Sequence, residues 1–152
     1  MTGEKTLIDK AFEFVNQGKV EEALGLISDN KTEYSAGKKE YLISKLYFKA
    51  GNFEKGVVYL EEAVHKDKSF AVLWEKIGDD LILLDKIEDA LKAYERLYIE
   101  IPEYSEILLK IGECHIALNN PQKAIGIFEA YLKINGDDEV ALKRIAKANR
   151  ML

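Results

Sequence analysis

Apolar and small residues recur along the chain at spacings of three and four, which place side chains on one face of a helix. Trp74, Gly78 and Leu81 follow this spacing, and so do Ala90 and Tyr94 a little further on. Between such segments stand residues that adopt turn geometry or interrupt a helix. The pattern predicts four antiparallel helix pairs, with turns at Gln17-Gly18, Gly51-Asn52, Asp85-Lys86 and Asn119-Asn120-Pro121.

The helix pairs repeat at a nearly fixed step. Gly78 and Gly112 are 34 residues apart, and Ala90 and Ala124 are separated by the same 34 residues. A period of this length is typical of stacked helical hairpins, in which each unit buries its apolar face against its neighbours. It divides the chain into repeats 4–36, 37–70, 71–104 and 105–138 and leaves a capping helix over 139–152.

The third repeat carries the most specific pattern, and the chain resembles the tetratricopeptide repeat (TPR) family through it. The resemblance implies an all-α fold, a TPR-type α-solenoid of antiparallel helix hairpins wound as a right-handed superhelix. It also implies a single TPR domain over 1–152, with the first helix of each hairpin on the concave face. Seven residues match the motif W-x2-L-G-x2-Y, A-x3-F, P: Trp74, Ile77, Gly78, Leu81, Ala90, Tyr94 and Pro102.

The other repeats keep only parts of this motif. The fourth has His115 in a slot that apolar residues fill elsewhere, so we expect a packed structural histidine. The second has Gly56 in a small-residue slot of its second helix. In the first, 28–30 (Ser-Asp-Asn) is expected to end the second helix early, which predicts the least stable hairpin. Ser69 and Asp138 are predicted N-caps, because a short side-chain oxygen can accept from first-turn amides.

The composition fits one folded domain. The chain has 152 residues, 47% of them hydrophobic and 32% charged, which is enough to bury a continuous core. The polar start, 1–5, leads directly into helical periodicity, and no apolar run is long enough for a signal peptide or a membrane span. The lone Cys114 excludes an internal disulfide. We therefore expect a cytoplasmic protein without a membrane partner.

The charge is distributed unevenly. The net charge of −5 argues against a nucleic-acid partner, because such binders rely on clustered Lys and Arg. Segment 71–104 has nine acidic and four basic residues, whereas 139–152 has one acidic and four basic residues. Two interpretations of this basic end stay open: contact with an acidic surface, or a solvated face whose cations complement the helix dipole.

The TPR resemblance implies that the first helices of the hairpins line a concave groove. On each of these helices, side chains at i, i+4 and i+7 share one stripe, so such positions are candidates for the groove surface. One interpretation is a peptide groove that accepts apolar residues, with Lys or Arg near Asp79 and Glu113. The other is that the apolar side chains pack between helices and the charges form surface ion pairs. The candidates are Ile8, Phe12, Val15, Tyr41, Lys45, Phe48, Glu75, Asp79, Ile82, Leu109, Glu113, Ile116, Lys143 and Lys147.

The sequence indicates no catalytic, metal or cofactor site. Cys114 and His115 are adjacent and so point about 100° apart on a helix, away from a common metal. Glycine-rich phosphate loops, Cys-x-x-Cys pairs and serine-centred elbows are absent. The Lys, Asn and Arg clamp with which some TPR domains hold chaperone carboxylates is not reproduced either, since its asparagines are missing.

Two functions remain as hypotheses. The leading one is a non-catalytic protein–protein interaction module that binds a partner segment with basic and apolar residues in the concave groove. The alternative is a self-association or structural scaffold module, a homo-oligomer or a portion of a larger protein.

Overall fold

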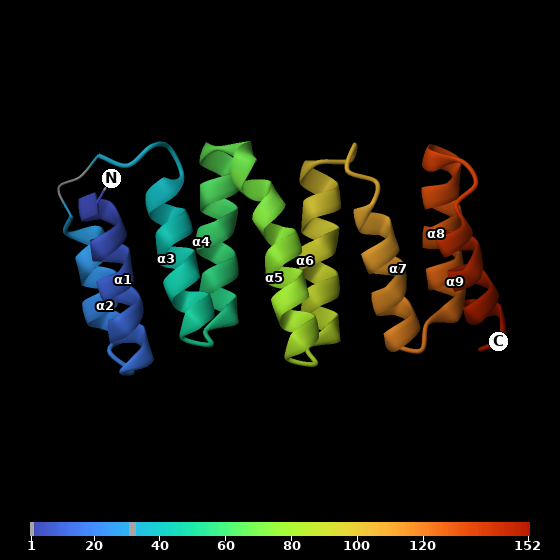
Figure 1. The fold of residues 1–152 in the computed structure, drawn as a ribbon, viewed down its shortest axis with the longest axis horizontal. Helices are drawn as coiled ribbons and strands as arrows, with labels where there is room; N and C mark the ends of the chain where they lie inside the picture. The colour runs from blue at the N-terminus through green and yellow to red at the C-terminus, as the bar shows by residue number, and fades with distance from the viewer. Residues whose placement is uncertain (1, 31–32) are drawn as a thin grey trace. The chain divides into compact units, whose positions relative to one another are not determined.

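The computed structural model describes residues 2–30 and 33–152. Over this part of the chain the structure is all-α, which confirms the predicted fold class (Figure 1). Among these residues, no helix combines the length and hydrophobicity that a membrane crossing requires. The helices are α1 Thr2–Asn16, α2 Val20–Ser28, α3 Lys38–Lys49, α4 Phe53–Lys66, α5 Leu73–Leu83, α6 Ile87–Glu100, α7 Ile107–Ala117, α8 Pro121–Asn135 and α9 Glu139–Asn149.

The four hairpin turns lie where the sequence predicts them, and all four have one geometry. In each turn a single residue has a positive φ, between 57° and 79°. The N–H of the next residue then donates to a carbonyl of the last helical turn, as from Lys86 to Leu81 (2.9 Å). This is the Schellman closure, which needs a residue that tolerates the left-handed region. The four residues are Gly18, Gly51, Asp85 and Asn119.

The chain divides into two compact units, Met1–Phe70 and Ala71–Leu152. In the first unit, α1 packs against α2 and α3, and Ala11, Ala23 and Ile27 lie in its core. Helix α2 has nine residues against 14 in α4, which confirms its early end. A short 3₁₀ helix, Lys68–Val72, joins the units.

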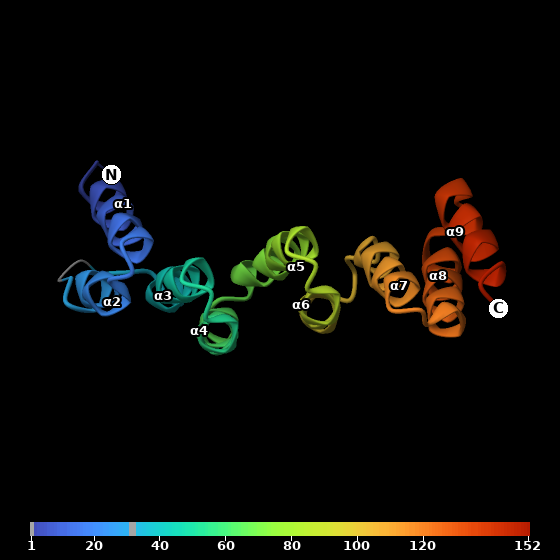
Figure 2. The same ribbon diagram turned by 90° about the horizontal axis from the view of Figure 1, so that it is seen from below.

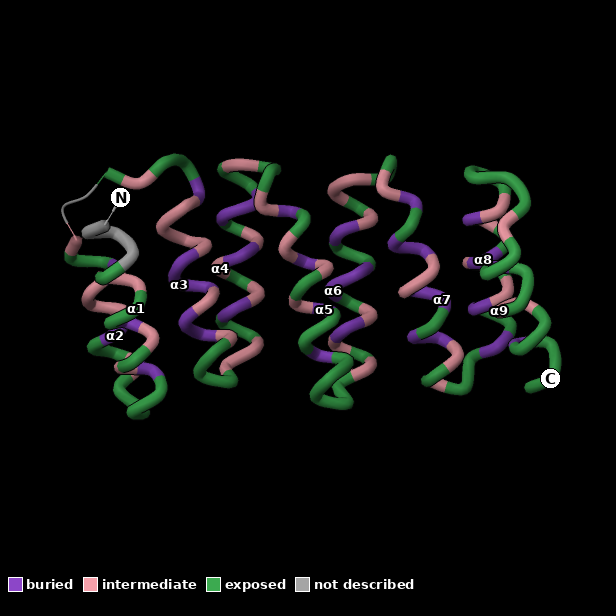
Figure 3. The backbone as a smooth tube through the Cα atoms, in the orientation of Figure 1, coloured by how far each residue is buried: buried purple, intermediate pink, exposed green. Residues whose placement is uncertain are grey.

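The second unit contains α5 to α9, and aromatic rings seated on glycines hold its hairpins together. A Cβ on Gly78 would lie 2.2 Å from the Tyr94 ring, and one on Gly112 would lie 2.3 Å from the Phe128 ring. Only glycine permits this approach between the two helices of a pair. Helix α9 packs against α8, and its Ala141 is completely buried. Figure 3 shows such buried positions recurring along the helices.

The two predicted N-caps have different outcomes. Asp138 caps α9 as predicted, because its Oδ1 accepts from the Ala141 N–H at 2.8 Å. The prediction for Ser69 is wrong: Ser69 lies inside the 3₁₀ helix, and its N–H donates to Asp67 Oδ1 at 2.9 Å. Helix α5 begins only at Leu73, without a side-chain cap. The 3₁₀ turn occupies the residues that the repeat period assigns to the start of this helix.

Candidate functional site

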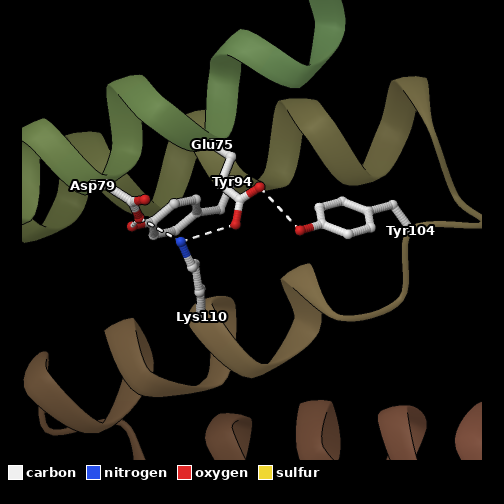
Figure 4. Close-up of polar contacts among 5 residues, drawn as sticks. All are labelled: Glu75, Asp79, Tyr94, Tyr104 and Lys110. Carbon is white, nitrogen blue, oxygen red and sulfur yellow. Dashed lines mark hydrogen bonds and ion pairs between the residues drawn. The ribbon is translucent and has the colours of Figure 1, made fainter.

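A cluster of charged and phenolic side chains connects α5, α6 and α7 within the second unit (Figure 4). Lys110 of α7 is at its centre. Its Nζ lies 2.6 Å from Asp79 Oδ1 and 2.9 Å from Glu75 Oε1, and both carboxylates project from α5. One ammonium therefore faces two carboxylates, which leaves this part of the cluster with one excess negative charge.

Two tyrosines complete the cluster. The Tyr94 hydroxyl donates to Asp79 Oδ1 at 2.7 Å, and the Tyr104 hydroxyl donates to Glu75 Oε2 at 3.0 Å. Lys110 Nζ also lies 5.5 Å from the centre of the Tyr94 ring, within the range of a cation–π contact. Because Gly78 lets the Tyr94 ring pass close to α5, the hydroxyl reaches the same carboxylate as Lys110.

The pKa values follow from this geometry. Burial raises the pKa of Tyr94, and the hydrogen bond to Asp79 raises it further. Partial burial alone would raise the pKa of Asp79, but the hydrogen bonds from Lys110 and Tyr94 outweigh it and lower this pKa. Burial likewise opposes the charged form of Lys110, whereas the hydrogen bonds to Asp79 and Glu75 raise its pKa. Asp79 and Lys110 therefore stay ionised at neutral pH.

Beside the cluster, the second unit has an open cleft of about 450 Å³. Helices α5 and α7 lie on one side of α6 (Figure 2), and the cleft is lined from all three. Its polar end has Asp79 and Glu113, whose side chains are 49% and 51% exposed. Toward the hairpin turns the lining becomes apolar, and Leu83 is 84% exposed there. The lining residues are Asp79, Ile82, Leu83, Ile87, Tyr94, Lys110, Glu113, Cys114 and Ala117.

Glu113 also has an intramolecular partner. Its Oε1 lies 2.6 Å from Arg144 Nη2, which projects from α9. The other terminal nitrogen of Arg144 is buried without a hydrogen-bond partner. Asp79 and Glu113, for which a basic partner is one of the two interpretations above, thus already have intramolecular cations. Asp79 shares Lys110 with Glu75, and Arg144 balances the charge of Glu113. These ion pairs join α7 to α5 and α9 to α7.

In the first unit the candidate residues belong largely to the packing. Val15 is buried in the core, and Ile8, Phe12 and Tyr41 pack against that core. The Phe48 ring lies on Gly56, where an added Cβ would be 2.7 Å away. Lys45 Nζ lies 5.1 Å from the centre of the Phe12 ring and 5.5 Å from that of Tyr41.

In the second unit the structure brings together only some of the candidates. Asp79, Ile82 and Glu113 line the cleft, and Glu75 joins the cluster through Lys110. Leu109 and Ile116 are partly buried elsewhere on α7, and Lys143 and Lys147 are exposed on α9. Sequence reasoning missed Leu83, Ile87, Tyr94, Lys110, Cys114 and Ala117 as lining residues. The only signal was the uninterrupted apolar run 81–84 before the turn at Asp85.

The Cys114 and His115 pair behaves as two packed side chains. Burial, with the nearby carboxylates of Glu113 and Glu95, raises the pKa of the Cys114 thiol to about 11. Burial and the charge of Lys123 lower the pKa of His115, whose Nδ1 has no hydrogen-bond partner. Within the described part of the chain, no three His, Cys, Asp or Glu side chains converge as metal ligands would.

Family models and curated proteins match parts of this chain. Two models described as tetratricopeptide repeat match residues 81–148 and 41–64, together more than half of the chain. The chain is also similar to tetratricopeptide repeat protein 21A of Mus musculus, with 31% identity over 85 residues, and of Homo sapiens, with 29%. Each match covers 50% of this chain but only 6% of the relative's length.

Solved structures share the fold at low identity. The C-terminal part of a TPR repeat-containing protein from Cytophaga hutchinsonii has a TM-score of 0.62 at 15% identity, covering 95% of this chain and 58% of that one. MamA has a TM-score of 0.56 at 15% identity, covering 98% and 82%. The first TPR of Spaghetti (RPAP3), solved with the HSP90 peptide SRMEEVD, has a TM-score of 0.53 at 16% identity, covering 78% and 97%. At such identities the likeness shows the fold, an α-solenoid of helix hairpins.

Proposed function

The chain belongs to the tetratricopeptide repeat family, and from this premise we propose that it is a non-catalytic module that docks a segment of another protein. The fold is in general a protein–protein interaction module. We propose further that residues 1–152 act as one TPR domain and that the docking face is the one lined by first helices.

The observation that carries the proposal is the cleft of the second unit. It combines an apolar lining from three helices with two half-exposed carboxylates, and its volume lies in the range of small-ligand pockets. Exposed apolar side chains beside a cleft are typical of interaction sites rather than of solvated surface. The Spaghetti (RPAP3) structure, which has this fold and holds a peptide, supports a peptide segment as the class of partner.

The geometry refines the chemistry expected of that partner. An aliphatic or aromatic side chain would enter the apolar end at Ile82 and Leu83. A Lys or Arg would face Asp79 and Glu113, but it would compete there with Lys110 and Arg144. We therefore propose that the apolar contact supplies most of the affinity and that the partner's cation supplies orientation and association rate. The buried Val15 and the partly buried candidates of the first unit, such as Phe12, are proposed to stabilise the repeat.

Affinity capture from the native cell lysate tests this function. Ile82→Asp places a charge in the cleft, and Ile99→Asp places the same charge on an exposed apolar residue of α6 outside the cleft. We expect Ile82→Asp to lose the partners that the unaltered chain and Ile99→Asp both retain. If Ile82→Asp captures the same partners as the unaltered chain, the cleft is not the docking site.

A further inference from the structure

The lining of the cleft has more acidic than basic residues, whereas segment 139–152 has more basic than acidic residues. This difference in charge indicates which segment could bind in the cleft. We infer that the cleft of the second unit receives α9 of a second copy of this chain. The inference rests on the proposed function in taking the cleft as the docking site. It adds the identity of one partner, and both surfaces belong to the same compact unit, Ala71–Leu152.

Helix α9 presents the chemistry that such a cleft would accept. Its inner face is fixed, because Ala141 and Ala148 are completely buried and Arg144 reaches Glu113. On the outer face Leu142 is 48% exposed, beside the exposed Lys143 and Lys147. Lys143 and Lys147 are four residues apart and so share one stripe along the helix. Lys143 Nζ already pairs with Glu139 Oε1, one turn earlier on α9. The aliphatic Leu142 and the cation of Lys147 are therefore the groups available to another molecule without disturbing the fold.

The cleft is complementary to this face in both respects. Its apolar end, at Ile82 and Leu83, and its acidic end, at Asp79, are three to four residues apart on α5, about one helical turn. On α9, Lys147 follows Leu142 by five residues, about 7.5 Å along the helix axis. An amphipathic helix that lies in such a groove can place its apolar residue at one end and its cations at the other.

The net charges support the same pairing. Segment 71–104, which supplies α5 and α6, has five more acidic than basic residues, whereas 139–152 has three more basic than acidic residues. Lys110 neutralises only one of the two carboxylates of α5 that it contacts. A contact of one helix with one cleft is smaller than a standard interface, so we expect a dissociation constant weaker than about 1 µM.

Two exposed positions allow a charge-complementation experiment on the intact chain. Leu83→Lys places a cation at the rim of the cleft, and Leu142→Glu places an anion on the outer face of α9. Neither residue is buried, so both variants should fold. In its own copies each variant alone places an unpaired charge against the leucine that it should contact, whereas a mixture of the two brings the new lysine and the new glutamate together.

Sedimentation equilibrium, from about 10 µM to about 1 mM protein at low salt, measures the outcome. We expect the unaltered chain to associate, each variant to stay monomeric and the equimolar mixture to associate again. The matched controls Leu84→Lys and Ile134→Glu change exposed apolar residues outside the cleft and outside α9, and they should associate as the unaltered chain does. Circular dichroism melts verify that every variant is folded.

Three results would overturn the inference: an unaltered chain that is monomeric at the highest concentration, single variants that associate normally, or a mixture that stays monomeric. These results can be distinguished from a failure of the proposed docking function. A monomeric chain whose lysate partners are lost with Ile82→Asp refutes the second copy and leaves the docking cleft intact. If the Ile82→Asp variant still associates, α9 of a second copy does not bind in the cleft.

Discussion

The close packing of the Phe128 ring on Gly112 predicts a large effect from one methyl group. An alanine Cβ at position 112 would lie 2.3 Å from Phe128 Cε1, whereas favourable carbon contacts lie at about 3.5–4.0 Å. Phe128 is completely buried, so its ring can retreat only by separating α7 from α8. Overpacking of this kind costs about 1–3 kcal/mol.

Helix propensity acts in the opposite direction. Replacing a glycine inside a helix by alanine contributes up to about 1 kcal/mol of stability. An overlap this close places the steric cost at Gly112 in the upper part of its range, about 2–3 kcal/mol. After the gain in helix propensity we therefore expect Gly112→Ala to lose about 1–2 kcal/mol. Gly126 in α8 provides the matched control, since an added Cβ there meets nothing within 4 Å. Gly126→Ala should therefore be more stable than the unaltered chain.

Thermal unfolding followed by circular dichroism at neutral pH measures both variants. For a chain of this size 1 kcal/mol corresponds to about 2–4 °C, so the midpoint should fall by about 2–8 °C for Gly112→Ala and rise by up to about 4 °C for Gly126→Ala. In a Phe128→Leu background the additional loss from Gly112→Ala should shrink, because the two changes share one contact. A Gly112→Ala midpoint at or above that of the unaltered chain would refute the close packing of ring and glycine.

Three further predictions concern α6 and α7. Tyr94→Phe keeps the ring on its glycine but removes the hydrogen bond to the ionised Asp79, so stability should fall by about 1.5–3 kcal/mol; a denaturant titration with an unchanged midpoint would contradict the bond. Because burial lowers the pKa of His115, the unfolded chain binds the additional proton between the lowered value and about 6.5. Stability should therefore decrease as the pH falls through that window, and melts of His115→Leu at about pH 7.5 and 5.5 should show a smaller decrease than the unaltered chain. The Cys114 thiol, with its pKa raised to about 11, should react with a thiol reagent at about pH 8 far more slowly in the folded than in the urea-unfolded chain; equal rates would place the thiol on the surface.

The sequence by itself determined the helices, the turns and the family. Residues such as Gly51 and Asn119 specify the turns because a positive φ is a local steric property that few side chains tolerate. The Asp138 cap was predictable for the same reason, since the N–H that donates to its carboxylate lies three residues along the chain. The fixed spacing of Gly78 and Gly112 could be identified as a repeat before any contact was known.

The tertiary structure alone decided the cleft and its charges. Lys110 meets Glu75 and Asp79 across 31 or more residues, and no local pattern distinguishes it from other helix lysines. Tyr94 reaches Asp79 because Gly78 lets two helices approach, so its polar role depends on the packing of its ring. Helical periodicity identifies which side chains share a face of one helix. Which neighbouring helix meets that face, and at what offset, is determined by how side chains from consecutive repeats fill the space between them.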